Sequence, residues 1–190
     1  MLRKLVVGLY QANCYVLGCK TTLEGLVIDP GDEVFRIVNE ISQLGLRIRY
    51  ILLTHGHVDH VGGAQELKRI TKAPIWIHAL DARGLYFQPD GHLSDHQEIA
   101  LGKFTVSVIH TPGHSPGGVC FQAPGAVFTG DTLFAGSIGR TDFPGGNHRQ
   151  LIQGVVERIF PLGDDLRAYP GHGPNTTIGS ERVSNPFFRM

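Results

Sequence analysis

The sequence contains little cysteine and no excess of either charge. Its 190 residues include 3 cysteines, and 17 Lys and Arg balance 17 Asp and Glu, so the formal net charge at pH 7 is zero. A chain without a basic excess lacks the electrostatic footprint of a nucleic-acid-binding domain, so we expect no nucleic-acid partner. The odd number of cysteines, with no Cys-x-x-Cys pattern, favours free thiols in a reducing cytoplasm. Cys14 and Cys120 lie in strand-like segments, where we expect them as small core residues.

Long hydrophobic runs are also missing. No apolar stretch approaches the ~20 residues that cross a bilayer, and the apolar run that follows Met1 is too short for a signal peptide. We therefore expect no membrane partner. No linker or low-complexity segment divides the chain, and its length suits one substantial core, so a single domain over residues 1–190 is expected.

What the sequence does contain is a dense run of potential metal ligands. His55, His57, Asp59 and His60 lie between an apolar strand-like segment, 50–53, and a helical pattern that begins near Gln65 and ends near Lys72. Imidazole and carboxylate together suit zinc, iron or manganese. In an extended segment, residues two apart point to the same side, so His55 and His57 should converge while Asp59 and His60 enter the first helical turn. One ion cannot easily use all four side chains, which favours a pair of metals over a polar loop with scattered histidines.

The rest of the chain alternates between strand and helix patterns. We predict strands at 2–7, 12–18, 26–28, 75–77, 104–109, 119–122, 126–129 and 166–169. Helical spacing is present at 34–44 and 150–160, and the tail from Thr176 predicts a helix that ends before Pro186. Residues 79–102 are less regular, and we expect a surface segment near the rim of the site. Together these patterns predict an α/β fold in which helices cover sheet layers.

Three later strand ends each carry one more candidate ligand beside glycine: His114, Asp131 and His172. Taken singly, each would be an ordinary loop histidine or a turn aspartate. The repetition of strand, turn and ligand is what favours a shared metal site.

The order Thr54-His55-x-His57-x-Asp59-His60, followed by His114, Asp131 and His172, resembles the metallo-β-lactamase-fold hydrolases. Within that superfamily, Thr129–Phe134 and Gly139–Pro144 resemble the short form of the glyoxalase II branch. The resemblance implies an αββα four-layer sandwich with the metal site at one edge of the two sheets. It also implies two divalent ions, zinc first, with iron or manganese as alternatives. His55, His57 and His114 would hold one ion, Asp59, His60 and His172 the other, and Asp131 would bridge both.

That family implies a metal-dependent hydrolase for a small thioester such as S-lactoylglutathione. Two ions roughly 3.5–4 Å apart can share a water and lower its pKa, so that a metal-bound hydroxide attacks the acyl carbonyl. Asp59 would be a ligand first and could also orient the hydroxide as a catalytic residue. Arg140 matches a family position where a basic side chain meets a substrate carboxylate; the alternative is a salt-bridged loop arginine. Asp29 either hydrogen-bonds behind a ligand histidine or simply forms a Pro-Gly turn.

The sequence also departs from long-form glyoxalase II. Only a short tail follows His172, so the C-terminal helical region that supplies glutathione-binding basic side chains is not expected. The sequence therefore supports thioester hydrolysis better than it supports glutathione as the thiol of the substrate. His55, His114 and Asp131 alone would make the two-histidine, one-carboxylate site of a mononuclear iron persulfide dioxygenase, which is the main alternative. A nuclease is disfavoured by the neutral charge, and a non-enzymatic domain by the full ligand set. The acyl group, the native metal and the oligomeric state stay open.

Overall fold

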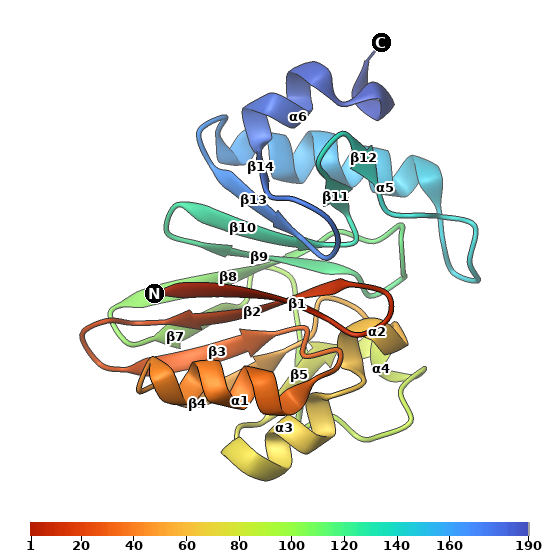
Figure 1. Cartoon of the computed structure of the whole chain (residues 1–190). Helices are drawn as coiled ribbons and strands as arrows, with labels where there is room; N and C mark the ends of the chain where they lie inside the picture. The colour runs from red at the N-terminus through yellow and green to blue at the C-terminus, as the bar shows by residue number, and fades with distance from the viewer. Residues whose placement is uncertain (190) are drawn as a thin grey trace.

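The computed structural model, which describes residues 1–189, has two six-stranded sheets face to face with helices on both outer sides (Figure 1). The first sheet has the order β1-β2-β3-β4-β5-β6. Its strands are β1 (Leu2–Val7), β2 (Ala12–Gly18), β3 (Glu24–Ile28), β4 (Arg47–Leu52), β5 (Ile75–His78) and β6 (Gly91–Leu93). The β1–β2–β3 part is antiparallel, with Leu5 opposite Cys14, whereas β3 to β6 run parallel.

The second sheet has the order β14-β13-β10-β9-β8-β7. Its strands are β7 (Glu98–Leu101), β8 (Phe104–His110), β9 (Val119–Ala123), β10 (Ala126–Gly130), β13 (Arg167–Pro170) and β14 (Thr176–Thr177). Only β10 and β13 pair in parallel, and the other neighbours are antiparallel. A small hairpin, β11 (Leu133–Phe134) and β12 (Ser137–Ile138), follows β10.

Helices form the two outer layers (Figure 1). The first sheet is covered by α1 (Val34–Gln43) and α3 (Ala64–Thr71), and the short helices α2 (Val58–Val61) and α4 (Ala79–Ala82) follow β4 and β5. The second sheet is covered by α5 (His148–Gly154), a π-helical turn at Val155–Ile159, a 3-10 turn at Phe160–Leu162, α6 (Ile178–Ser184) and a 3-10 turn at Pro186–Phe188. The predicted αββα arrangement is therefore confirmed.

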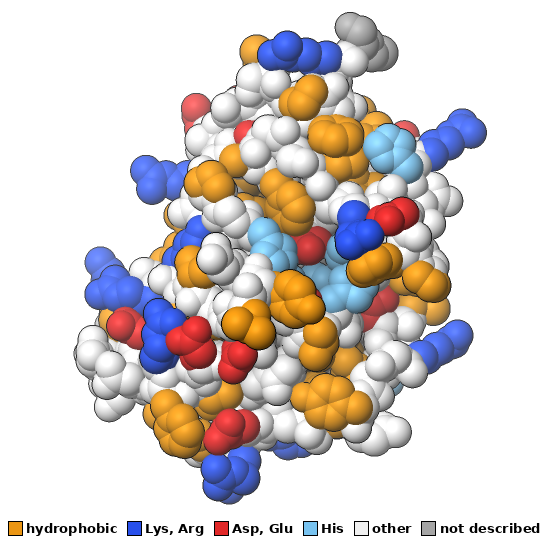
Figure 2. Space-filling model, turned by 45° about the vertical axis from the view of Figure 1, so that its right-hand side comes forward, with side chains coloured by type: hydrophobic (Ala, Val, Ile, Leu, Met, Phe, Trp, Pro, Cys, Tyr) orange, Lys and Arg blue, Asp and Glu red, His pale blue; other side chains and the backbone are white. Residues whose placement is uncertain are grey.

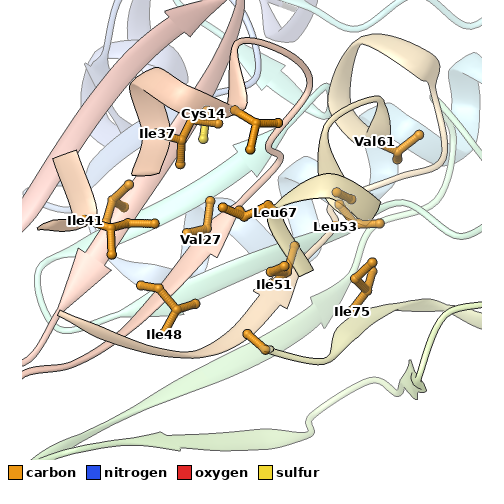
Figure 3. Packing of buried hydrophobic residues seen from close by; sticks show 14 of the residues in the cluster. Cys14, Val27, Ile37, Ile41, Ile48, Ile51, Leu53, Val61, Leu67 and Ile75 are labelled. Carbon is orange, nitrogen blue, oxygen red and sulfur yellow. The ribbon is translucent and has the colours of Figure 1, made fainter. Parts of the chain in front are cut away.

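Alternation along the central strands explains why both faces of each sheet are buried. In β3, Leu26 and Ile28 face the other sheet, whereas Val27 between them faces the helices. Because both faces of such strands are covered, their sequences are continuous apolar runs. Figure 3 shows the layer between the first sheet and its helices, including Val27, Ile37, Ile41, Ile48, Ile51 and Leu67. Cys14 lies in this layer and Cys120 in the layer beneath α5, so both are core residues as predicted.

The expectation of an irregular segment over 79–102 was wrong. This stretch contains α4, β6 and β7, and the two strands form one edge of each sheet. Each strand has only three or four residues, and in β6 only Leu93 is buried, so there is too little alternation for the sequence to predict a strand. The helix predicted over 150–160 begins at His148 instead, where the Asn147 side chain accepts a hydrogen bond from the Gln150 amide.

Within residues 1–189, no helix has both the length and the apolar character needed to cross a bilayer.

Candidate metal centre

The seven predicted metal ligands meet at one edge of the sandwich. They follow β4, β8, β10 and β13: His55, His57, Asp59, His60, His114, Asp131 and His172. Strands β8, β10 and β13 run in the same direction, because β9 is antiparallel to both β8 and β10. Their carboxyl ends therefore lie at the same edge, where α/β folds commonly hold their sites. Figure 2 shows histidines gathered on this face around an acidic side chain, with hydrophobic side chains beside them.

The first group of donors consists of His55, His57 and His114. Their ligand atoms all lie within 4.8 Å of one another, and Nδ1 of His57 is 2.9 Å from Nε2 of His114. His55 and His114 are buried, and His57 is partly exposed. Three imidazole nitrogens that converge in this way can hold a divalent transition-metal ion.

The second group consists of Asp59, His60 and His172. Nε2 of His172 lies 3.2 Å from both Nε2 of His60 and Oδ2 of Asp59. His60 is fully buried, whereas Asp59 and His172 are partly exposed. As predicted, Asp59 and His60 belong to the first turn of the helix that follows the ligand loop.

Asp131 faces both groups. Its Oδ1 is 3.5 Å from Nε2 of His60, and its Oδ2 is 3.5 Å from Nε2 of His114 and 3.7 Å from Nε2 of His172. Within residues 1–189, Asp131 Oδ1 and His55 Nε2 are buried without a hydrogen-bond partner. Buried polar atoms are rarely left unpaired, and both atoms point into the donor cluster. The residues therefore fit divalent metal ions.

Electrostatics differ between the two groups. Burial, followed by the neighbouring imidazoles, lowers the pKa of His55, and burial likewise lowers the pKa of His57. Both rings are therefore neutral at pH 7, which is the form that binds a metal. The first group offers neutral nitrogen donors.

The second group is dominated by carboxylates. Burial alone would lower the pKa of His60, but the charge of Asp131 and the hydrogen bond that His60 donates to Asp29 outweigh it and raise the pKa to about 9. Burial would also raise the pKa of Asp59, yet the hydrogen bond from His172 and the charge of His60 bring it to about 2. That same bond raises the pKa of His172. The negative charge here favours a cation, either a proton or a metal ion.

Residues behind the donors determine which ring nitrogen points inward. Asp29 accepts hydrogen bonds from the Thr54 hydroxyl at 2.6 Å and from Nδ1 of His60 at 3.0 Å. Because the Thr54 hydroxyl donates to Asp29, it accepts from Nδ1 of His55 at 3.0 Å. Nδ1 of His114 donates to the Arg140 carbonyl at 2.8 Å. In each case Nε2 faces the centre. The hydrogen-bonding interpretation of Asp29 is therefore confirmed.

Asp81 is an organising residue that the sequence did not indicate. It is 7% exposed, and its carboxylate accepts hydrogen bonds from the Gly56 amide, the Ser115 hydroxyl and the Gly117 amide at 3.0, 2.7 and 2.6 Å. It thus joins the loop of His55 and His57 to the loop of His114. A single aspartate in a short helical segment is normally exposed, so the sequence contains no signal that would identify Asp81 as a buried residue that joins two loops.

The His172 loop is fixed by the first sheet. The hydroxyl of Tyr15 and the amide of Asn13 donate to the Pro170 carbonyl at 2.7 and 2.8 Å. Gly171 lies so close to Asp131 and His60 that a Cβ there would overlap both side chains. Glycine is therefore required for His172 to reach the second group.

Arg140 lies at the rim beside the first group. Its guanidinium forms two hydrogen bonds of 2.8 Å with Asp142 and stacks 3.8 Å from the centre of the Phe143 ring. Phe143 in turn contacts the His57 ring edge-on at 5.7 Å between centroids. The salt bridge with Asp142 is the one expected if Arg140 is a salt-bridged loop arginine. The position of Arg140 beside the donor cluster also suits a contact with the substrate.

Comparison with known families agrees with this geometry. The model of the metallo-beta-lactamase superfamily matches residues 7–172. The chain belongs to the metallo-beta-lactamase superfamily. Among curated members of this superfamily, hydroxyacylglutathione hydrolase GloC of Haemophilus influenzae is 38% identical, over 95% of this chain and 94% of the relative.

Two solved structures of metallo-beta-lactamase-fold proteins are also similar. ETHE1 from Myxococcus xanthus superimposes with a TM-score of 0.90 at 29% identity, covering 98% of this chain and 83% of that one. TTHA1623, solved in a di-iron-bound form, has a TM-score of 0.83 at 36% identity and covers 97% of this chain and 99% of that one.

Proposed function

We propose that the protein is a metal-dependent hydrolase of a small thioester, with S-lactoylglutathione or a related hydroxyacyl thioester as its substrate. The observation that carries this proposal is the pair of three-residue donor groups with Asp131 between them. The similarity to GloC, whose name specifies hydroxyacylglutathione, supports this choice of thioester.

The proposed centre holds two divalent ions. His55, His57 and His114 would bind one ion, Asp59, His60 and His172 the other, and Asp131 both. Zinc is our first choice because it suits mixed imidazole and carboxylate donors, and iron or manganese would fit the same residues. The di-iron form of TTHA1623 supports a two-ion site. Bound ions would supply Lewis-acid charge that activates water and stabilises the acyl oxygen and the departing thiolate.

The chain's own residues have separate tasks in this proposal. Asp59, whose pKa of about 2 keeps it ionised, would accept a hydrogen bond from the attacking water and orient it toward the carbonyl carbon. Arg140 would form an ion pair with a carboxylate of the substrate, either in place of its ion pair with Asp142 or in addition to it. The three cysteines are unpaired, which suits a reducing compartment, and we assign the protein to the cytoplasm.

The alternative function is a persulfide dioxygenase with one iron, and the similarity to ETHE1 is the observation that fits it. His55, His114 and Asp131 could hold that iron without the second group. The two functions therefore differ in whether Asp59, His60 and His172 are needed.

The test combines metal analysis of protein purified without added metal with two assays. We expect hydrolysis of S-lactoylglutathione that a chelator abolishes and added zinc restores, and no oxygen uptake with glutathione persulfide. Iron-dependent oxygen uptake that survives His172→Ala would instead establish the dioxygenase.

A further inference from the structure

A pocket opens beside the second donor group, with Asp59 in its lining. We call it the turn pocket: the β1–β2 turn supplies Leu9 and Tyr10, the start of α2 supplies Val58 and Asp59, and Asp32 and Glu66 are also among its lining residues. Its volume is about 310 Å³. Small-molecule sites begin at about 300 Å³, so the pocket is large enough for part of a substrate.

Several well-exposed apolar side chains line the pocket. Leu9 is 97% exposed, Tyr10 70% and Val58 65%, and all three line the pocket together with the candidate metal ligand Asp59. Contiguous exposed apolar side chains beside a site commonly mark a binding surface. An aliphatic group bound there would remove these side chains from water.

The charges around the pocket are all negative. Asp32 and Glu66 line it, and no Lys or Arg does within the described part of the chain. Asp32 forms no ion pair within residues 1–189, and Glu66 forms one with Arg69 at 3.8 Å. A carboxylate in the pocket would lie close to Asp32 and Glu66, so the glutathione half of a thioester is less favoured on this side than beside Arg140.

We propose that the turn pocket binds the acyl chain of the substrate, and that it selects aliphatic, uncharged chains longer than lactoyl. This inference rests on the proposed thioester hydrolysis. The carboxylate-bearing thiol would then extend toward Arg140, which lies beside the first donor group. Leu9 and Val58 become the residues that determine acyl specificity, and Asp32 and Glu66 those that exclude carboxylated acyl groups.

The first test compares glutathione thioesters with lactoyl, α-hydroxyhexanoyl and α-hydroxyglutaryl groups on the metal-loaded protein. Because each methylene gains from burial, we expect kcat/KM for hydroxyhexanoyl to exceed that for lactoyl by about tenfold. Val58→Ser should lower this ratio by about threefold. The matched control is Val183→Ser, since Val183 is 77% exposed on α6, and its ratio should match the wild type. Glu66→Gln should raise kcat/KM for hydroxyglutaryl by about threefold.

The second test does not depend on turnover. In methyl NMR of the metal-loaded protein, α-hydroxyhexanoate should shift the Leu9 and Val58 signals, whereas lactate should not. Equal kcat/KM for the lactoyl and hydroxyhexanoyl thioesters, or Leu9 and Val58 signals that do not move, would overturn the pocket assignment. Failure to hydrolyse any thioester would overturn the proposed function instead, and the NMR result would still decide whether the pocket binds aliphatic chains.

Discussion

The two halves of the molecule supply the donor cluster in different ways. In the first half, one segment of six residues after β4 carries four donors: His55, His57, Asp59 and His60. In the second half, three separate strand ends carry one donor each: His114, Asp131 and His172. Neither half alone completes the first donor group (His55, His57 and His114) or the second (Asp59, His60 and His172), because each takes two members from the first half and one from the second. The site therefore exists only when the two sheets are packed together.

The largest expected effect comes from the second-half residue that faces both groups. Asp131→Ala should lose both metal ions together, because its carboxylate lies within 3.7 Å of donors from each group. Metal content after dialysis, measured by mass spectrometry, checks this. Asp142→Ala is the control, since that acid is exposed on the neighbouring loop and should keep both ions. Full occupancy in Asp131→Ala would show that the bridging assignment is wrong.

A narrower loss is expected from His172, which belongs to the second group alone. His172→Ala should retain the ion of the first group and lose the other, and hydrolysis of S-lactoylglutathione should fall by orders of magnitude. Steady-state kinetics with metal analysis measures both effects. His92→Ala removes an exposed histidine outside the cluster and should behave like the wild type. Unchanged hydrolysis in His172→Ala would mean that one group suffices.

Asp81 tests the connection between the halves directly. Asp81→Asn places an amide NH2 opposite either the Gly56 or the Gly117 amide, so the two ligand loops should separate and metal affinity should fall about 10–100-fold. Glu181→Gln is a matched control, because Glu181 is also a buried carboxylate with three hydrogen bonds, from Thr176, Gly136 and Asn185. Competition with a chelator and thermal melting should show similar destabilisation of both variants but weaker metal binding only in Asp81→Asn. An equal loss of metal affinity in Asp81→Asn and Glu181→Gln would mean that Asp81 only stabilises the fold.

The smallest expected effect concerns the rim. If Arg140 binds a substrate carboxylate, Arg140→Ala should raise KM for S-lactoylglutathione about threefold to tenfold while kcat and metal content change little. Arg149→Ala removes another exposed arginine, on α5, and serves as the control. An unchanged KM in Arg140→Ala would leave only the loop salt bridge with Asp142.

Local patterns account for what could be predicted. The donors of the first half could be found because strand, loop and helix follow one another within a few residues, and the spacing alone implied that His55 and His57 converge. The repeated strand ends with glycine pointed to His114, Asp131 and His172. Asp81 escaped prediction because its hydrogen-bond partners lie far away in sequence, whereas β6 and β7 escaped because strands of three or four residues show too little alternation.

The sequence by itself therefore determined most of the strands and the longer helices and indicated the candidate donor residues, since these follow from backbone periodicity and side-chain chemistry. Only the tertiary structure decided how Asp131 faces both groups, how Asp81 joins two ligand loops, and how the β1–β2 turn and α2 enclose the turn pocket. The physical reason is that these contacts join residues far apart in the chain, whose meeting depends on the packing of two complete sheets and on glycines that permit close approach, such as Gly171.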